Sequence, residues 1–190
     1  FNLNNPLFWD DDDWIINNNF VHTISWDNVR FWFTHNTIAG VGLQSNYYRP
    51  FLFLTFAFNY TISGINPFSY HLFSNLIHVV NGVLVFLLIK KVLATLDIRR
   101  ISDVKTLSRW VTFLTALIFI IHPLQTEAIT YISGRGDALV AMFMLLALLG
   151  FLKAQGSTLK VFKVDPWMAL SVASLILGLL SRETAIIFPF

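Results

Sequence analysis

The 190-residue chain has no cysteine, which excludes disulfide bonds and thiolate chemistry. Charged residues are scarce at 13%, roughly half of the usual share in soluble domains. Hydrophobic residues make up 55% of the chain, and its mean hydropathy is +0.62. The sequence shows no self-similarity with a period of about 34 residues, so it contains no tetratricopeptide array. This composition predicts an all-α polytopic membrane protein. Because the chain starts at Phe1 and ends at Phe190 in an apolar run, we expect it to be a fragment of a longer one.

Four apolar segments predict membrane spans, at about 70–96, 108–121, 137–152 and 165–180, and the start of a fifth follows at Ala185. A span needs roughly 20 residues. Three of the four are shorter. Either polar residues at their ends are drawn below the membrane surface, which implies a recessed polar cavity on one side, or the bounds of the spans are inexact. Residues 51–58 are too few to span and predict an interfacial or re-entrant helix. We therefore expect residues 1–69 to form an exoplasmic loop with interfacial helices, and 70–190 to form the partial transmembrane domain.

The charges sort between the two sides of these spans. Two segments, from Lys90 to Arg109 and from Lys153 to Lys163, hold nine of the 13 basic residues, and the positive-inside rule makes their side cytoplasmic. The opposite side receives Arg30, Arg49, Arg135 and Arg182. It also receives eight of the 11 acids: Asp10, Asp11, Asp12, Asp13, Asp27, Glu127, Asp137 and Glu183. This sorting predicts an extracytoplasmic active site.

Four consecutive aspartates, Asp10 to Asp13, lie between Trp9 and Trp14. Carboxylates at this density repel one another and resist burial, so they need water, cations or a chemical task. A metal-binding loop, a general base and a solvated turn are the alternatives. The glycine and terminal glutamate of a calcium helix-loop-helix motif are missing. Soluble glycosyltransferases use an Asp-x-Asp element for metal and nucleotide-sugar, but nucleotide-sugars are cytoplasmic and this turn is predicted outside. A phosphate leaving group that lies near a guanidinium does not require a metal, so we expect none to be bound.

Two further motifs precede the second span. Tyr48 and Arg49 lie directly before Pro50. Arginine binds phosphate through paired hydrogen bonds, so Arg49 is a candidate for a phosphate contact. The alternative is that these residues anchor the chain at the membrane interface. His71 is expected near the exoplasmic end of its span. His78, two turns deeper, is expected to pack with a hydrogen-bonded imidazole.

The remaining candidates follow the second and fourth spans. His122 and Glu127 cap a helix end or belong to the site, because ionisable groups at membrane depth are functional candidates. Arg135 and Asp137 are two residues apart in a flexible, glycine-containing turn, so an arginine and a carboxylate are available there. Arg182 and Glu183 form a mutual or cross-helix ion pair, or contact substrate.

Several short motifs occur in a fixed order along the chain: Trp9-Asp10-Asp11, Tyr48-Arg49-Pro50, Gly64-Ile65-Asn66-Pro67 with Tyr70-His71, His122-Pro123 with Thr126-Glu127-Ala128, Ser133-Gly134-Arg135 with Asp137, and Ser181-Arg182-Glu183. In this order they resemble the amino-terminal membrane region of the transmembrane and tetratricopeptide-repeat O-mannosyltransferases and their bacterial relatives. That family belongs to the C-type (GT-C) glycosyltransferase superfamily.

The resemblance implies a GT-C-type helix bundle that transfers mannose or a similar hexose, with inversion, from a polyprenyl- or dolichyl-phosphate donor. The acceptor would be a hydroxyl of a protein or glycan on the exoplasmic or lumenal face of a bacterial inner membrane or the endoplasmic reticulum membrane. The family's paired catalytic acids carry over onto Asp10 and Asp11, whereas Asp12 and Asp13 are additional. Arg182 stands where the family usually has lysine.

We interpret Asp10 or Asp11 as the base that takes the acceptor proton. Arg49 and Arg135, then Arg182, are candidates for the lipid phosphate, and Tyr48 adjoins Arg49. The side chains expected to orient the arginines or bind sugar hydroxyls are Glu127, Asp137, His71 and His122, with Glu183 beside Arg182. No cofactor and no nucleic acid are expected. A membrane transporter and a non-catalytic membrane scaffold remain the alternatives.

Overall fold

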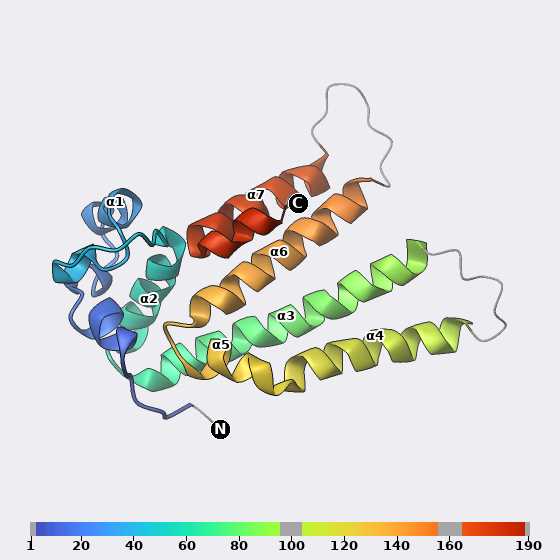
Figure 1. Ribbon diagram of the computed structural model, residues 1–190, viewed down its shortest axis with the longest axis horizontal. Coiled ribbons are helices and arrows are strands. Elements are labelled where there is room, and N and C mark those ends of the chain that lie inside the picture. The colour runs from blue at the N-terminus through green and yellow to red at the C-terminus, as the bar shows by residue number, and fades with distance from the viewer. Residues whose placement is uncertain (1–2, 96–103, 156–164, 189–190) are drawn as a thin grey trace.

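The computed structural model describes residues 3–95, 104–155 and 165–188, and within these ranges the chain forms helices and no strand. Four long helices run side by side as an elongated bundle (Figure 1). They are α3 (Pro67–Thr95), α4 (Val104–Ile121), α6 (Arg135–Ala154) and α7 (Pro166–Ser181). The shorter helices α1 (Trp26–Thr34) and α2 (Pro50–Ser63) lie with the N-terminal segment at one end of this bundle, and α5 (Thr126–Thr130) joins α4 to α6 near the same end.

The long helices pack in one row, with α4 against α3, α3 against α6, and α6 against α7. Small residues bring their backbones close together. A Cβ atom added at Gly150 would lie 2.8 Å from the backbone oxygen of Trp167, so α6 and α7 could not approach this closely with a larger residue. The main hydrophobic core lies where α2 meets the row, around Leu52, Phe53 and Phe56.

The four predicted apolar segments are helical over their described residues, as expected, and residue 96 at the end of the first lies outside the described ranges. The start of α7 has the predicted cap: the Asp165 carboxylate accepts a hydrogen bond from the Trp167 N–H at 2.7 Å, and Pro166 occupies the first helical position. The short helix expected over 51–58 also forms, but it extends to Ser63, and half of its 14 residues are buried. The segment Glu183–Ile187, where a fifth span was expected to start, is a 3-10 turn.

Length and composition make two helices, α3 and α6, suitable for crossing a membrane. Thr106–Ile121 and Pro123–Thr130 add a third if this pair, bent by 49°, is one broken span. α7 is apolar but has only 16 residues. Large apolar side chains such as Leu76, Val83, Ile118 and Ile176 are exposed along the row, which suits a lipid environment. The described chain is therefore an all-α membrane protein, and the four spans with their orientation stay a prediction.

Candidate active site

Several predicted site residues lie where α2, the start of α6 and the end of α7 meet the acidic turn. This turn is Asp10 to Asp13, and its last two residues begin a single π-helical turn (Asp12–Ile16). Asp10 is exposed, whereas Asp11 is fully buried with 0% of its surface accessible. The Asp11 carboxylate accepts hydrogen bonds from the Ser133 N–H at 2.9 Å, from the Ser133 hydroxyl, and from the Phe8 N–H at 3.3 Å. These bonds fasten the acidic turn to the segment just before α6. Burial raises the pKa of Asp11, and the hydrogen bonds oppose this effect in part.

Tyr131 lies beside the exposed acid of this turn. Partial burial and a side-chain hydrogen bond to Asp10 raise the pKa of Tyr131 to about 12, so its hydroxyl stays protonated at neutral pH and can donate. The ring of Phe8 lies 5.3 Å from the Tyr131 ring, and that of Trp9 lies 6.4 Å away. Sequence reasoning assigned no role to Tyr131 or Ser133. Their position directly before the Gly134-Arg135 turn was the available signal.

Two ion pairs connect α2, α6 and α7 at this end of the bundle. Arg49 Nη2 lies 3.0 Å from Glu183 Oε2, and Arg49 Nε lies 3.2 Å from both carboxylate oxygens. The Tyr48 N–H also donates to Glu183 Oε1 at 3.2 Å. Arg182 pairs with Asp137. Arg182 and Glu183 therefore do not pair with each other but form the cross-helix pairs that were the alternative.

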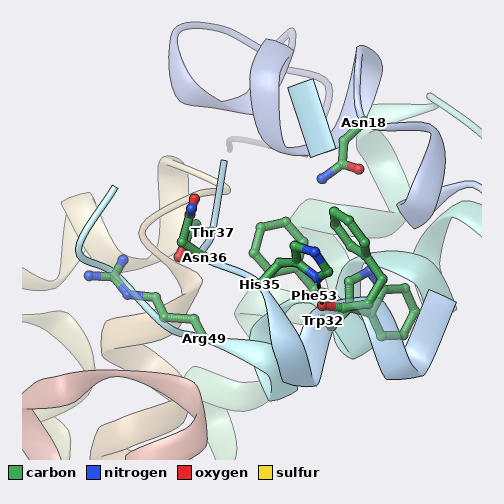
Figure 2. A pocket seen from close by; sticks show the side chains of 8 residues that line it. Asn18, Trp32, His35, Asn36, Thr37, Arg49 and Phe53 are labelled. Carbon is green, nitrogen blue, oxygen red and sulfur yellow. Dashed lines mark hydrogen bonds between the residues drawn. The ribbon is translucent and has the colours of Figure 1, made fainter. Parts of the chain in front are cut away.

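Arg49 is further held by aromatic rings. Its guanidinium carbon lies 4.7 Å from the ring centre of Tyr47 and 5.8 Å from that of Trp14. Figure 2 shows Arg49 at the edge of a small cavity formed with Asn18, Phe31, Trp32, His35, Asn36, Thr37 and Phe53. The volume of this cavity is about 10 Å³, which is too little for a sugar.

The Arg49–Glu183 pair leads to a testable prediction about pH. Partial burial raises the pKa of Glu183, but the hydrogen bonds from Arg49 and Tyr48 and the charge of Arg49 outweigh it and lower the pKa. A carboxyl whose pKa is lowered by folding stabilises the fold above its unfolded pKa, and this contribution disappears as pH falls through the folded pKa. We expect a double-mutant cycle of Arg49→Met and Glu183→Gln to give a coupling of about 1 kcal/mol at pH 7, because the pair is partly solvated.

Thermal unfolding of the purified protein at pH 7 and at acidic pH measures this coupling. The coupling should shrink as pH falls below the ordinary glutamate range near roughly 4.3. A coupling that is unchanged by acid would contradict a charge-based contribution. Lys90→Met, a change at the far end of α3, is the control for general effects of charge removal.

Arg135 lies in the interior, with 0% of its surface accessible. Its donors bind Ser74 Oγ at 3.1 Å, Asn59 Oδ1 at 2.7 Å and the Tyr70 carbonyl at 2.9 Å, with Thr55 contributing two longer bonds. Each of these partners is a neutral oxygen from α2 or α3. Arg135 therefore does not pair with Asp137, and its guanidinium does not face the surface in this conformation.

The histidines and Glu127 differ in their burial and in their partners. His71 is buried, with Nε2 3.0 Å from the Asn5 carbonyl oxygen, and it interacts electrostatically with Asp11. His122 is exposed, and its Nδ1 accepts from the Leu124 N–H at 3.2 Å, as a capping residue does. Glu127 is exposed in the first turn of α5 and interacts electrostatically with Asp137. The prediction for His78 is confirmed, because its Nε2 lies 3.0 Å from the Ile120 carbonyl oxygen in the α3–α4 interface.

Carboxylates and imidazoles are also the side chains that bind metal ions. Within the ranges that the structure describes, no three histidine, aspartate or glutamate side chains are grouped as ligands. The carboxylates are instead divided between hydrogen bonds, ion pairs and solvent. Fold and site together define an all-α membrane protein with paired acids and a cluster of ion pairs at one end of its helices.

Comparison with known proteins identifies the family. Human protein O-mannosyl-transferase TMTC1 is 34% identical over 192 residues, covering 94% of this chain and 20% of that protein. Human TMTC2 is 38% identical over 65% of this chain, and mouse TMTC3 is 37% identical over 57%. They match over 13% and 10% of their own lengths. No family model and no solved structure matches the chain. The chain belongs to the TMTC family of protein O-mannosyl-transferases, and it spans a fifth or less of the length of these relatives.

Proposed function

We propose that the protein containing this chain is a membrane glycosyltransferase that moves mannose, or a similar hexose, from a polyprenyl- or dolichyl-phosphate donor to a protein hydroxyl. The observation that carries the proposal is the different burial of the two acids, Asp10 and Asp11. One carboxylate is buried and anchored, and its neighbour is exposed at the end of the helix bundle. This arrangement, in a chain of the O-mannosyl-transferase family, supports transfer chemistry at this end of the bundle.

Asp10 is the base in this proposal. A general base must come within about 2.6–3.2 Å of the proton that it removes, which requires an accessible carboxylate. Asp10 is exposed, whereas both Asp11 oxygens already accept hydrogen bonds from the protein. The acceptor oxygen attacks the anomeric carbon as its proton passes to Asp10. The bond from that carbon to the phosphate oxygen breaks, and the lipid phosphate leaves with the electron pair and inversion at the anomeric carbon.

Arg182 and Arg49 are the proposed partners of the lipid phosphate. Arg182 is the more accessible, with 28% of its side chain exposed against 8% for Arg49. An incoming phosphate would compete with Asp137 for Arg182, and would have to open the Glu183 pair to reach Arg49. Arg135 is a weaker candidate for binding the lipid phosphate than Arg182 or Arg49, because its N–H groups already donate to interior oxygens. It supports the site by holding α2 and α3 against α6.

The accessible polar groups around the acidic turn complete the proposed site. His122 and Glu127 are exposed and are proposed to contact sugar hydroxyls. His71 lies behind Asp11 and is proposed to orient it. Tyr48 is proposed to hold Glu183, and thereby Arg49, through its backbone N–H. The exoplasmic or lumenal side of the membrane is proposed from the charge distribution alone.

A donor panel in membranes that carry the full natural protein tests this function. Labelled mannose and glucose are supplied on dolichyl phosphate and on a bacterial-type polyprenyl phosphate, and labelled GDP-mannose serves as the control. We expect label to pass to protein from a lipid-linked mannose. Transfer from GDP-mannose alone, with the lipid-linked pool kept empty, contradicts the proposed donor. Absence of transfer from every donor contradicts the enzyme assignment and favours a transporter or scaffold.

A further inference from the structure

Trp9 has an unusual backbone conformation directly before the candidate base. Its φ angle is +57°, and it is the only residue other than glycine with a positive φ in the described part of the chain. For a bulky L-residue this left-handed region is sterically unfavourable. Residues held in such conformations concentrate at ligand-binding sites and active sites. The Trp9 side chain is therefore a candidate for contact with a ligand.

The Trp9 side chain does not recover this cost by burial, because 79% of its surface is accessible. It is nevertheless held beside two rings. Its ring centre lies 6.0 Å from that of Phe8 and 6.4 Å from that of Tyr131, and it meets Tyr131 edge-on at 87°. The Trp9 carbonyl accepts the Asp12 N–H at 3.0 Å, which fixes the turn on its other side. Trp9 is thus an exposed indole supported at its edge by other aromatic rings.

The position of this indole relative to the acid pair suggests its ligand. Asp10 is the next residue, and it is hydrogen-bonded to the same Tyr131 against which the indole rests. The face of an indole is electron-rich and attracts the weakly positive C–H groups of an apolar surface. A pyranose ring presents such a C–H face while its hydroxyls remain available to polar groups. A sugar stacked on Trp9 would have polar partners in Asp10 and the Tyr131 hydroxyl.

We propose that Trp9 is a sugar-binding residue that stacks on the hexose ring of the lipid-linked donor. The inference rests on the proposed function, because it takes the hexose to be carried by a lipid phosphate. An aromatic anchor at the membrane surface is the competing explanation for an exposed tryptophan. The two differ in what they recognise: a stacking platform binds the sugar, whereas an anchor contacts the lipid phase irrespective of any sugar.

The chain offers a matched control in Trp26. Trp26 is also 79% exposed, but it lies at the first position of α1, and Trp9 rather than Trp26 adjoins the acid pair. Trp9→Asn removes the ring and introduces a residue that tolerates the left-handed conformation, so the placement of Asp10 is preserved. Trp9→Phe restores an aromatic face. Trp26→Asn repeats the loss of an exposed indole elsewhere.

The experiment measures equilibrium binding of two probes, dolichyl-phosphate mannose and dolichyl phosphate, to the full natural protein in nanodiscs. We expect the wild type to bind the mannose-bearing lipid more tightly. Trp9→Asn should reduce this preference by about tenfold, Trp9→Phe should restore part of it, and Trp26→Asn should leave it unchanged. Thermal unfolding of each variant shows that the fold is intact.

Each outcome separates the inference from the proposed function. An unchanged preference in Trp9→Asn overturns the sugar contact, even if the wild type transfers mannose. An equal loss of both lipids in Trp9→Asn overturns it in favour of an anchor, and a wild type without preference for the mannose-bearing lipid also overturns it. A preference that depends on Trp9, in a protein that transfers no label, supports the binding site and contradicts only the enzymatic function.

Discussion

Asp10→Asn should reduce sugar transfer by about 10²–10⁴-fold, which is the usual contribution of a general base. The amide keeps the shape of the side chain but cannot accept the acceptor proton. Asp10 is exposed, and the hydroxyl of Tyr131 can still donate to an amide oxygen, so abundance and thermal unfolding should change little. The assay is transfer from the lipid-linked sugar in membranes containing the full natural protein, normalised to the amount of enzyme.

Variants of Asp11 provide the contrast to Asp10→Asn, because Asp11 has the same side chain as Asp10 but is buried. Asp11→Ala leaves the buried Ser133 N–H without its acceptor, which costs about 1–3 kcal/mol. We expect that change to lower the midpoint of thermal unfolding and to reduce transfer through a loosened turn. Ser133→Thr should retain the hydroxyl bond and most of the activity. A stable Asp11→Asn variant without transfer, beside an active Asp10→Asn, would reverse the two roles.

Arg135→Met should be the most destabilising single change among the candidate residues, by about 3–5 kcal/mol. Met fills much of the volume but leaves the oxygens of Asn59, Ser74 and Tyr70 without their donor in a buried site. The guanidinium also packs among rings, with its central carbon 4.9 Å from the ring centre of Phe56. Arg135→Lys should not rescue stability, because a single ammonium cannot reach acceptors on α2 and α3 at once.

Thermal unfolding in detergent, together with the yield of monodisperse protein, measures the effect of these Arg135 variants. Arg30→Met, at an exposed position in α1, is the control and should be neutral. If Arg135→Met folded normally but no longer bound dolichyl phosphate, the interior assignment would be wrong. Arg135 would then return to the front of the phosphate candidates.

The helices could be predicted from the sequence because their signals are local. Apolar runs of helical length, and the Asp165-Pro166 cap, depend only on neighbouring residues. The environment of His78 was also predictable, since an imidazole two turns inside an apolar helix has few partners other than a backbone oxygen of the next helix.

The site itself was less predictable because its partners are distant in the chain. Asp10 and Asp11 are chemically identical neighbours, and only the docking of Ser133, 122 residues later, decides which one is buried. Arg135 and Asp137 suggested a pair by proximity in sequence. Residues two apart on a helix do not face each other, so one points to the interior and the other to Arg182.

The hydrogen bonds of Arg135 also depend on the order in which the chain is synthesised. Thr55 and Asn59 in α2 lie 80 and 76 residues before their donor. During synthesis, α2 and α3 leave the ribosome while α6 does not yet exist. Their oxygens must therefore keep water or temporary partners until that guanidinium arrives. The hydrogen bonds between α2 and Arg135 can therefore form only after residue 135 has been synthesised, and a nascent chain that stops before it lacks their donor.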